Sequence, residues 1–133
     1  MCTVIFKSIN NNVAFENNNA EFSASVSSTL NVYADYKQKV FLRFTAQLEK
    51  LPETTAQPFF LVGAITVNGK LFQYRSKEFN QGDLANHNGQ IAFTFFIPPH
   101  VTLYPSELKC YVYNPNRNFL KIHFLKVETI QQN

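Results

Sequence analysis

The side chains that could support acid–base or metal chemistry are few and far apart in this sequence. The three histidines are His87, His100 and His123. None of them is followed two or four positions later by a second metal-binding residue, which is the usual spacing in metal sites. Glu78 could pair with Glu107 or Glu49 as in a glycosidase, but seven glutamates in a β-rich chain offer many accidental pairs. The sequence also has no Gly-x-Ser-x-Gly motif and no phosphate-binding glycine loop. We therefore expect a non-catalytic protein without a cofactor.

The two cysteines are too few for a disulfide framework. Cys110 alternates with Leu108 and Val112, and in such a run a cysteine behaves as a small core hydrophobe. We expect it to be buried and inert. Cys2 is either a frayed terminal residue or the lipid-bearing cysteine of a processed lipoprotein. The second interpretation needs a signal sequence, which does not open this chain, so the first is favoured.

Length and composition indicate one globular domain. With 133 residues, 45% of them hydrophobic and 15% aromatic, the chain can build a single core without metals or disulfides. The formal net charge is only +3, and the nearest approach to a basic cluster is Lys37 with Lys39. A nucleic-acid partner needs a larger basic patch, so we expect none. Apolar runs such as residues 59–65 are far shorter than the roughly 20 residues that span a bilayer, so we also expect no membrane-spanning segment.

Alternation of apolar and polar residues with a period of two dominates the pattern, and helical periodicity is nearly absent. Residues 44–51 fit either a helix or a strand. The alternating segments lie at residues 40–44, 59–67, 91–97, 108–112 and 119–130. The turn signals between them are Asn68-Gly69, Asn88-Gly89, Pro98-Pro99 and Asn114-Pro115-Asn116. We predict an all-β antiparallel sandwich of about eight or nine strands.

Polar segments are assigned to turns and loops. The first third of the chain is rich in asparagine, especially over residues 10–19. We prefer edge strands at residues 4–6 and 22–26 joined by asparagine-rich turns, and low-complexity disorder is the alternative. Residues 51–58 and 80–88 are predicted to be connecting loops.

Outward-facing aromatic residues form the candidate ligand site. Tyr111 and Tyr113 alternate with apolar residues that we expect to be buried, so both tyrosines should point outward. Arg43 should point outward for the same reason. Tyr74 shares a side of its strand with Phe72 in this pattern. Aromatic faces edged by polar groups suit sugar rings, whose C–H faces stack while their hydroxyls form hydrogen bonds. We predict carbohydrate binding through Tyr111, Tyr113, Arg43 and Tyr74. The alternative is that the tyrosines only stabilise the sheet as cross-strand pairs.

The carboxy-terminal part of the chain resembles a known group of domains. Residues 106–116, SELKCYVYNPN, and residues 120–128, LKIHFLKVE, are similar to the closing strand pair of jelly-roll, galactose-binding-like or carbohydrate-binding-module-like domains in secreted and surface proteins of Bacteroidetes-type bacteria. The upstream part agrees more loosely. The resemblance implies that the antiparallel β-sandwich is a jelly roll and that the domain is exported to the cell surface or beyond.

Two departures from the family pattern bear on ligands. The resemblance implies a structural calcium site built from a glutamate near the amino terminus and an acidic pair before the final strand. Glu16 could be that glutamate, but His123 and Phe124 or their neighbours occupy the acidic positions, and a histidine does not replace a carboxylate for so hard a cation. The chain also has no tryptophan, so tyrosines would have to supply the sugar platform.

We expect residues 1–133 to form a single domain that is part of, or excised from, a larger exported protein. The predicted function is carbohydrate recognition, with an oligo- or polysaccharide and the other domains of the parent chain as partners. The alternative is a structural spacer or protein-interaction module of a bacterial cell-surface protein.

Overall fold

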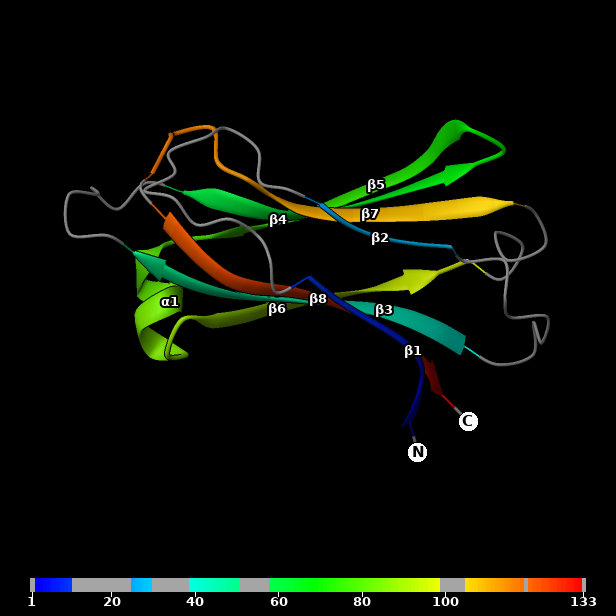
Figure 1. Ribbon diagram of the computed structural model, residues 1–133, viewed down its shortest axis with the longest axis horizontal. Helices are drawn as coiled ribbons and strands as arrows, with labels where there is room; N and C mark the ends of the chain where they lie inside the picture. Colours follow the sequence, from blue (N-terminus) through cyan, green and yellow to red (C-terminus); the bar gives the residue numbers. More distant parts are fainter. Residues whose placement is uncertain are drawn as a thin grey trace.

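The structure, a computed structural model, describes residues 2–10, 25–29, 39–50, 58–98, 105–118 and 120–132. These residues form two four-stranded antiparallel sheets that face each other, with a short helix at one end of the sandwich (Figure 1). The elements are β1 (Cys2–Asn10), β2 (Val26–Thr29), β3 (Lys39–Lys50), β4 (Phe59–Val67), β5 (Lys70–Phe79), α1 (Gln81–Asn86), β6 (Gln90–Ile97), β7 (Ser106–Tyr113) and β8 (Leu120–Gln132). The all-β antiparallel sandwich predicted from the alternation is confirmed.

The strand order identifies the topology. One sheet has the order β1-β8-β3-β6 and the other β2-β7-β4-β5. β1 therefore pairs with β8, β2 with β7, β3 with β6 and β4 with β5, as in one long hairpin. Rolling that hairpin brings β3 beside β8 and β4 beside β7. This arrangement is a jelly roll, the predicted fold.

The core lies between the two sheets and consists of alternate residues of each strand. β6 shows the pattern most clearly, because buried and exposed residues alternate along its whole length. Alternation at residues 91–97 and 108–112 predicts one inward-facing side for each strand, and the residues on that side are all buried: Ile91, Phe93, Phe95, Ile97, Leu108, Cys110 and Val112. The stretch from 44 to 51, which fitted a helix or a strand, falls largely in β3, where Leu42 and Phe44 are fully buried. Burial of each such side chain contributes about 1.5 to 3 kcal/mol.

Two Asn-Gly pairs make the tight turns that the sequence indicated. Asn68 and Gly69 have φ values of 52° and 79°, as a two-residue type I′ hairpin requires, and they join β4 to β5. Asn88 and Gly89 have similar values, 54° and 81°, and they precede β6. The predicted hairpin at Asn68-Gly69 is confirmed.

A buried pair of asparagines holds the connection from β7 to β8. The Asn114 side-chain amide donates to the carbonyl oxygen of Asn118 at 2.8 Å, and its oxygen accepts from the Asn118 backbone N–H at 3.0 Å. Both residues are buried. The Asn114 side chain satisfies backbone groups of the turn, and the Asn118 side-chain amide donates to the Asn114 side-chain oxygen at 2.9 Å. The predicted turn around Asn114-Pro115-Asn116 is therefore confirmed.

One segment predicted to be a loop contains a helix. Residues 80–88 include α1, which begins after Asn80. The Asn80 side chain accepts from the backbone N–H of Asp83 at 3.1 Å, and the Asp83 carboxylate accepts from the backbone N–H of Asn80 at 2.8 Å. This reciprocal capping box, together with burial of Leu84, overrides the polar composition that suggested a loop.

Several sequence predictions fall wholly or partly outside the described residues. β1 and β2 are edge strands of their sheets, as expected for residues 4–6 and for the end of 22–26. The asparagine-rich residues 11–19 with Glu16, the greater part of the predicted loop 51–58, and His100 lie outside the part of the chain that the structure describes.

Burial of Cys110 predicts a stability loss at alkaline pH. Burial raises the pKa of the Cys110 thiol far above its ordinary range. An unfolded cysteine ionises near pH 8.5, so the folded state retains a proton that the unfolded state loses above that pH. The free energy of unfolding should therefore fall by about 1.4 kcal/mol for each pH unit above about 9.

Chemical denaturation across this pH range checks the prediction. A Cys2→Ser background removes the other thiol, and the added Cys110→Ala change should reduce the steepness of the decline. Parallel pH profiles for the two proteins would show that Cys110 ionises normally in the folded state.

Candidate functional site

The three predicted tyrosines lie on the outer face of the β2-β7-β4-β5 sheet. Tyr111 and Tyr113 of β7 are opposite Val62 and Phe60 of β4. Tyr74 of β5 is opposite Ala64, which is on the same side of β4 as Phe60 and Val62. We call the group of Phe60, Tyr74, Tyr111 and Tyr113 the tyrosine face.

The members of the tyrosine face contact one another. The rings of Phe60 and Tyr113 have centroids 5.8 Å apart and are tilted by 32°. Tyr111 is hydrogen-bonded to Tyr74 through its side chain, and burial, followed by the proximity of Tyr74, raises the pKa of Tyr111. Val62 points outward yet is 0% exposed. Tyr111 and Tyr113 are half-buried, whereas Tyr74 is 50% exposed. The tyrosine face is therefore a packed apolar layer that presents ring surface to solvent.

Arg43 does not belong to the tyrosine face. It lies on β3, in the opposite sheet, across from Glu128 of β8. Its guanidinium donates through Nε and Nη2 to one oxygen of Glu128, at 3.1 and 2.9 Å, and Lys126 lies 3.7 Å from the same oxygen. The Glu128 side chain is only 8% exposed, so the cations compensate a poorly solvated carboxylate. The four predicted ligand residues therefore do not share one face. Tyr74, Tyr111 and Tyr113 lie on one side of the sandwich, and Arg43 lies on the other.

Phe72 and Tyr74 were predicted to share one side of their strand, and a β-bulge in β5 shows that this prediction is wrong. The register of β4 with β5 shifts between Ile65 and Thr66, so Gln73 is opposite Ile65 while Leu71 is opposite Thr66. Phe72 is the extra residue of the bulge, and Leu71 takes the position on the side of Tyr74. Alternation along one strand cannot reveal such a shift, because it depends on the partner strand.

The glutamates considered for glycoside hydrolysis are not brought together. Glu78 is the cross-strand partner of Phe60, and Glu107 is the cross-strand partner of Thr66. Phe60 and Thr66 are both in β4 and are about 20 Å apart along this extended strand. Glu49 lies on β3 in the other sheet. Glycosidase carboxylates are about 5 to 9.5 Å apart. Among the described residues, no group of three or more His, Cys, Asp or Glu side chains could hold a metal ion.

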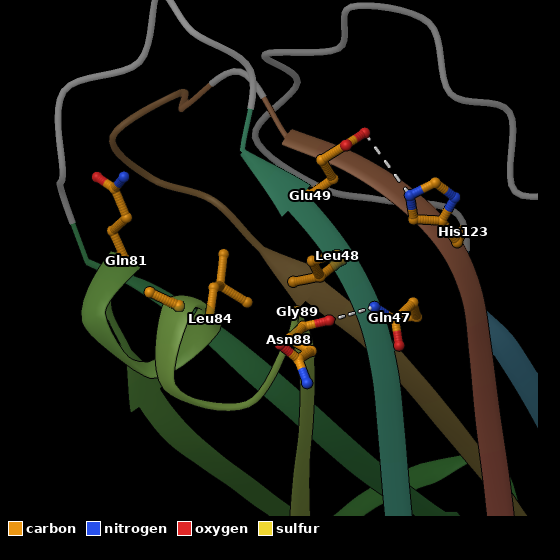
Figure 2. Close-up of a pocket in the computed structure, with 9 residues that line it drawn as sticks. Gln47, Leu48, Glu49, Gln81, Leu84, Asn88, Gly89 and His123 are labelled. Carbon is orange, nitrogen blue, oxygen red and sulfur yellow. Dashed lines mark hydrogen bonds and ion pairs between the residues drawn. The ribbon is translucent and has the colours of Figure 1, made fainter.

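A pocket of about 300 Å³, which was not predicted from the sequence, lies between α1, β3 and β8 (Figure 2). We call it the α1 pocket. It is lined by Gln47, Leu48, Glu49, Gln81, Leu84, Ala85, Asn88, Gly89 and His123. Leu48 and Leu84 are buried, and the other side chains reach solvent. Its residues come from three separated segments, so no local motif could have predicted it.

Backbone contacts fix the wall of the α1 pocket beside β3. The N–H of Leu48 donates to the carbonyl of Gly89 at 2.8 Å, and the N–H of Gly89 donates to the carbonyl of Leu84 at 2.7 Å. The Gln47 side-chain amide also donates to the carbonyl of Asn88 at 2.9 Å (Figure 2). These bonds tie the end of α1 to β3.

His123 of β8 lies at the rim of the α1 pocket. Its Nε2 is 3.7 Å from Oε2 of Glu49 (Figure 2). A register shift of β3 against β8 between Gln47 and Leu48 accompanies this arrangement. Glu49 is a single carboxylate, and calcium takes six to eight oxygen ligands. The described residues around His123 therefore do not fit the calcium site that the resemblance implied.

A second pocket, of about 340 Å³, lies on the side of α1 that faces β5 and β6. It is lined by Lys77, Glu78, Phe79, Asp83, His87, Gln90, Ile91 and Ala92. Two of its charged groups already have structural partners. Asp83 caps α1, and the Lys77 ammonium lies 5.3 Å from the centroid of the Phe79 ring. We therefore assign no ligand to this pocket.

Comparison with known proteins finds similarity to a solved structure but to no family model or curated protein. Among solved structures, the crystal structure of dimeric latent PorU from Porphyromonas gingivalis is similar, with a TM-score of 0.42 and 10% identity over 96% of this chain. The matched region is 12% of that chain. Among the described residues, no helix is long and apolar enough to cross a membrane.

Proposed function

We propose that this chain is a non-catalytic domain of an exported protein and that it recognises an oligo- or polysaccharide through the tyrosine face. The proposal includes the galactose-binding-like or carbohydrate-binding-module-like character suggested by residues 106–116 and a location at the cell surface or beyond. The observation that carries it is the side-chain hydrogen bond between Tyr111 and Tyr74, which reaches across β4 and connects aromatic residues of two non-adjacent strands.

The chemistry of the tyrosine face suits a sugar ring. Exposed ring surface can stack on C–H groups, and the hydroxyls of Tyr111 and Tyr74 can exchange hydrogen bonds with sugar hydroxyls. Ser76, Glu78 and Lys109 are exposed on the same side of the sheet and supply polar groups at the margin. Arg43 is not included, because it lies on the other sheet and is paired with Glu128.

The competing proposal is a protein-interaction module. It is favoured by β5, an edge strand on which Leu71, Phe72 and Tyr74 are 64%, 46% and 50% exposed. Exposed apolar side chains on an edge strand are typical of surfaces that pair with another chain. Binding of glycans separates the two proposals.

Replacement of Tyr74 by Ala should weaken glycan binding by about two- to tenfold, because one stacked ring contributes about 0.5 to 1.5 kcal/mol beyond its area. Tyr111→Ala and Tyr113→Ala should do the same, with a stability cost of up to about 1 kcal/mol from lost cross-strand contacts. The measurement is calorimetric titration with the best ligand from a glycan array, alongside denaturation curves.

Phe96→Ala is the matched control, because Phe96 is 42% exposed on the outer face of the opposite sheet. Its affinity should equal that of the wild type. An unchanged affinity in Tyr74→Ala would remove the tyrosine face from the binding site. Absence of any bound glycan on the array would favour the protein-interaction module.

A further inference from the structure

We propose that the α1 pocket is a second ligand site, separate from the tyrosine face, which takes adjacent hydroxyl groups of a single sugar unit. The choice of a sugar as the ligand class rests on the proposed function. The location and the polar groups of the site rest on the pocket itself (Figure 2).

The floor of the α1 pocket is apolar and held in place. Leu48 from β3 and Leu84 from α1 are both buried and both line the pocket. Gly89 is locked between them by its two backbone hydrogen bonds, and a Cβ built at this position would lie 2.3 Å from the Leu48 carbonyl oxygen. The backbone segments therefore approach as closely as glycine allows. A ligand would meet a formed surface and would not have to order it.

The rim of the α1 pocket has hydrogen-bonding groups on two sides. Glu49 and His123 lie on the β3 and β8 side, and Gln81 lies on the α1 side (Figure 2). The carboxylate of Glu49 is an acceptor with two oxygens, so it can accept from two neighbouring hydroxyls at once. Gln81 can both donate and accept. The distance of 3.7 Å between His123 Nε2 and Glu49 Oε2 exceeds a hydrogen-bond length, so this contact leaves the carboxylate able to accept hydrogen bonds from a ligand.

These groups favour a neutral hydroxylated ligand over the other ligand classes. The carboxylate of Glu49 disfavours an anion, and a single carboxylate is too few for a divalent cation. A purely apolar ligand would displace water from the polar rim and offer it no hydrogen bonds in return. A volume of about 300 Å³ is at the lower end of the range for ligand pockets, which suits one sugar unit rather than a chain.

The test uses NMR titration of the whole chain with D-glucose, D-galactose, D-mannose and L-fucose at millimolar concentration. At least one of these sugars should shift the backbone amides of Leu48, Glu49 and Gln81 with saturable, millimolar affinity. Glu49→Gln, an exposed and nearly isosteric change, should weaken this binding about tenfold, because a charge-assisted hydrogen bond becomes a neutral one. Glu107→Gln, an exposed glutamate on the other sheet, should leave it unchanged.

The proposal is overturned if no sugar of the panel shifts these amides, or if Glu49→Gln and Glu107→Gln bind equally. Tyr74→Ala separates this result from the proposed function. If the α1 pocket is a distinct site, Tyr74→Ala keeps the monosaccharide shifts while it loses affinity for the oligosaccharide. If Tyr74→Ala loses the monosaccharide shifts as well as the oligosaccharide affinity, all the sugar binds at one site, and this result would also contradict the proposal.

Discussion

Replacement of Phe93 by Ala should lower the free energy of unfolding by about 3 to 5 kcal/mol. Phe93 points into the core from β6 and is 8% exposed, and its ring centroid is 5.1 Å from that of Phe95. Removal of the ring costs the transfer free energy of its atoms and leaves a cavity that a two-sheet core cannot close. Urea denaturation, followed by tyrosine fluorescence and by circular dichroism, measures this loss.

Phe96 supplies the control on the same strand. It points to the opposite side of β6, is 42% exposed, and contacts Phe41 edge to face with ring centroids 5.8 Å apart. Phe96→Ala should cost only about 1 kcal/mol. Equal losses in the two variants would show that the register of β6 is wrong, because alternation is what separates these two positions.

Replacement of Gly89 by Ala should cost about 3 kcal/mol or more. Gly89 has a φ of 81°, which a residue with a Cβ adopts only at a cost of about 1 to 2 kcal/mol. The added Cβ would also lie 2.3 Å from the Leu48 carbonyl oxygen, so β3 and the end of α1 must separate. Their separation breaks the bond from the Leu48 N–H to the Gly89 carbonyl. Thermal and urea unfolding measure the total cost.

Gly69 separates the two causes. Its φ of 79° is nearly the same, but a Cβ there would meet nothing within 4 Å. Gly69→Ala should therefore show the backbone cost alone, about 1 to 2 kcal/mol. A Gly89→Ala loss no larger than that of Gly69→Ala would mean that the close approach of Gly89 to Leu48 does not exist in solution.

Alternation predicted the antiparallel sandwich because each strand has one buried face. The period-two pattern at residues 91–97 and 108–112 identifies the core side without knowledge of the partner strands, and Asn68-Gly69 encodes its turn locally. The helix at residues 81–86 was not predicted, because the polar composition of residues 80–88 indicated a loop, whereas the structure shows a capping box between Asn80 and Asp83 that begins a helix.

The candidate site was less predictable because it depends on which strands share a sheet. Arg43 and the tyrosines all point outward, yet only the strand order reveals that β3 and β7 belong to opposite sheets. The shift at Phe72 and the approach of Glu49 to His123 both arise from register shifts between paired strands. Such shifts are properties of two segments at once, so a pattern read along one segment does not contain them.

The central claim is that the tyrosine face binds glycan, and NMR mapping with the best oligosaccharide from the array tests it most directly. The amides and ring protons of Tyr74, Tyr111 and Tyr113 should shift together along one binding curve, since these side chains form one contiguous surface. Resonances of Arg43 and Phe96, on the other side of the sandwich, should remain in place. Saturable shifts confined to residues away from the tyrosine face, or no shift with any glycan, would contradict the account.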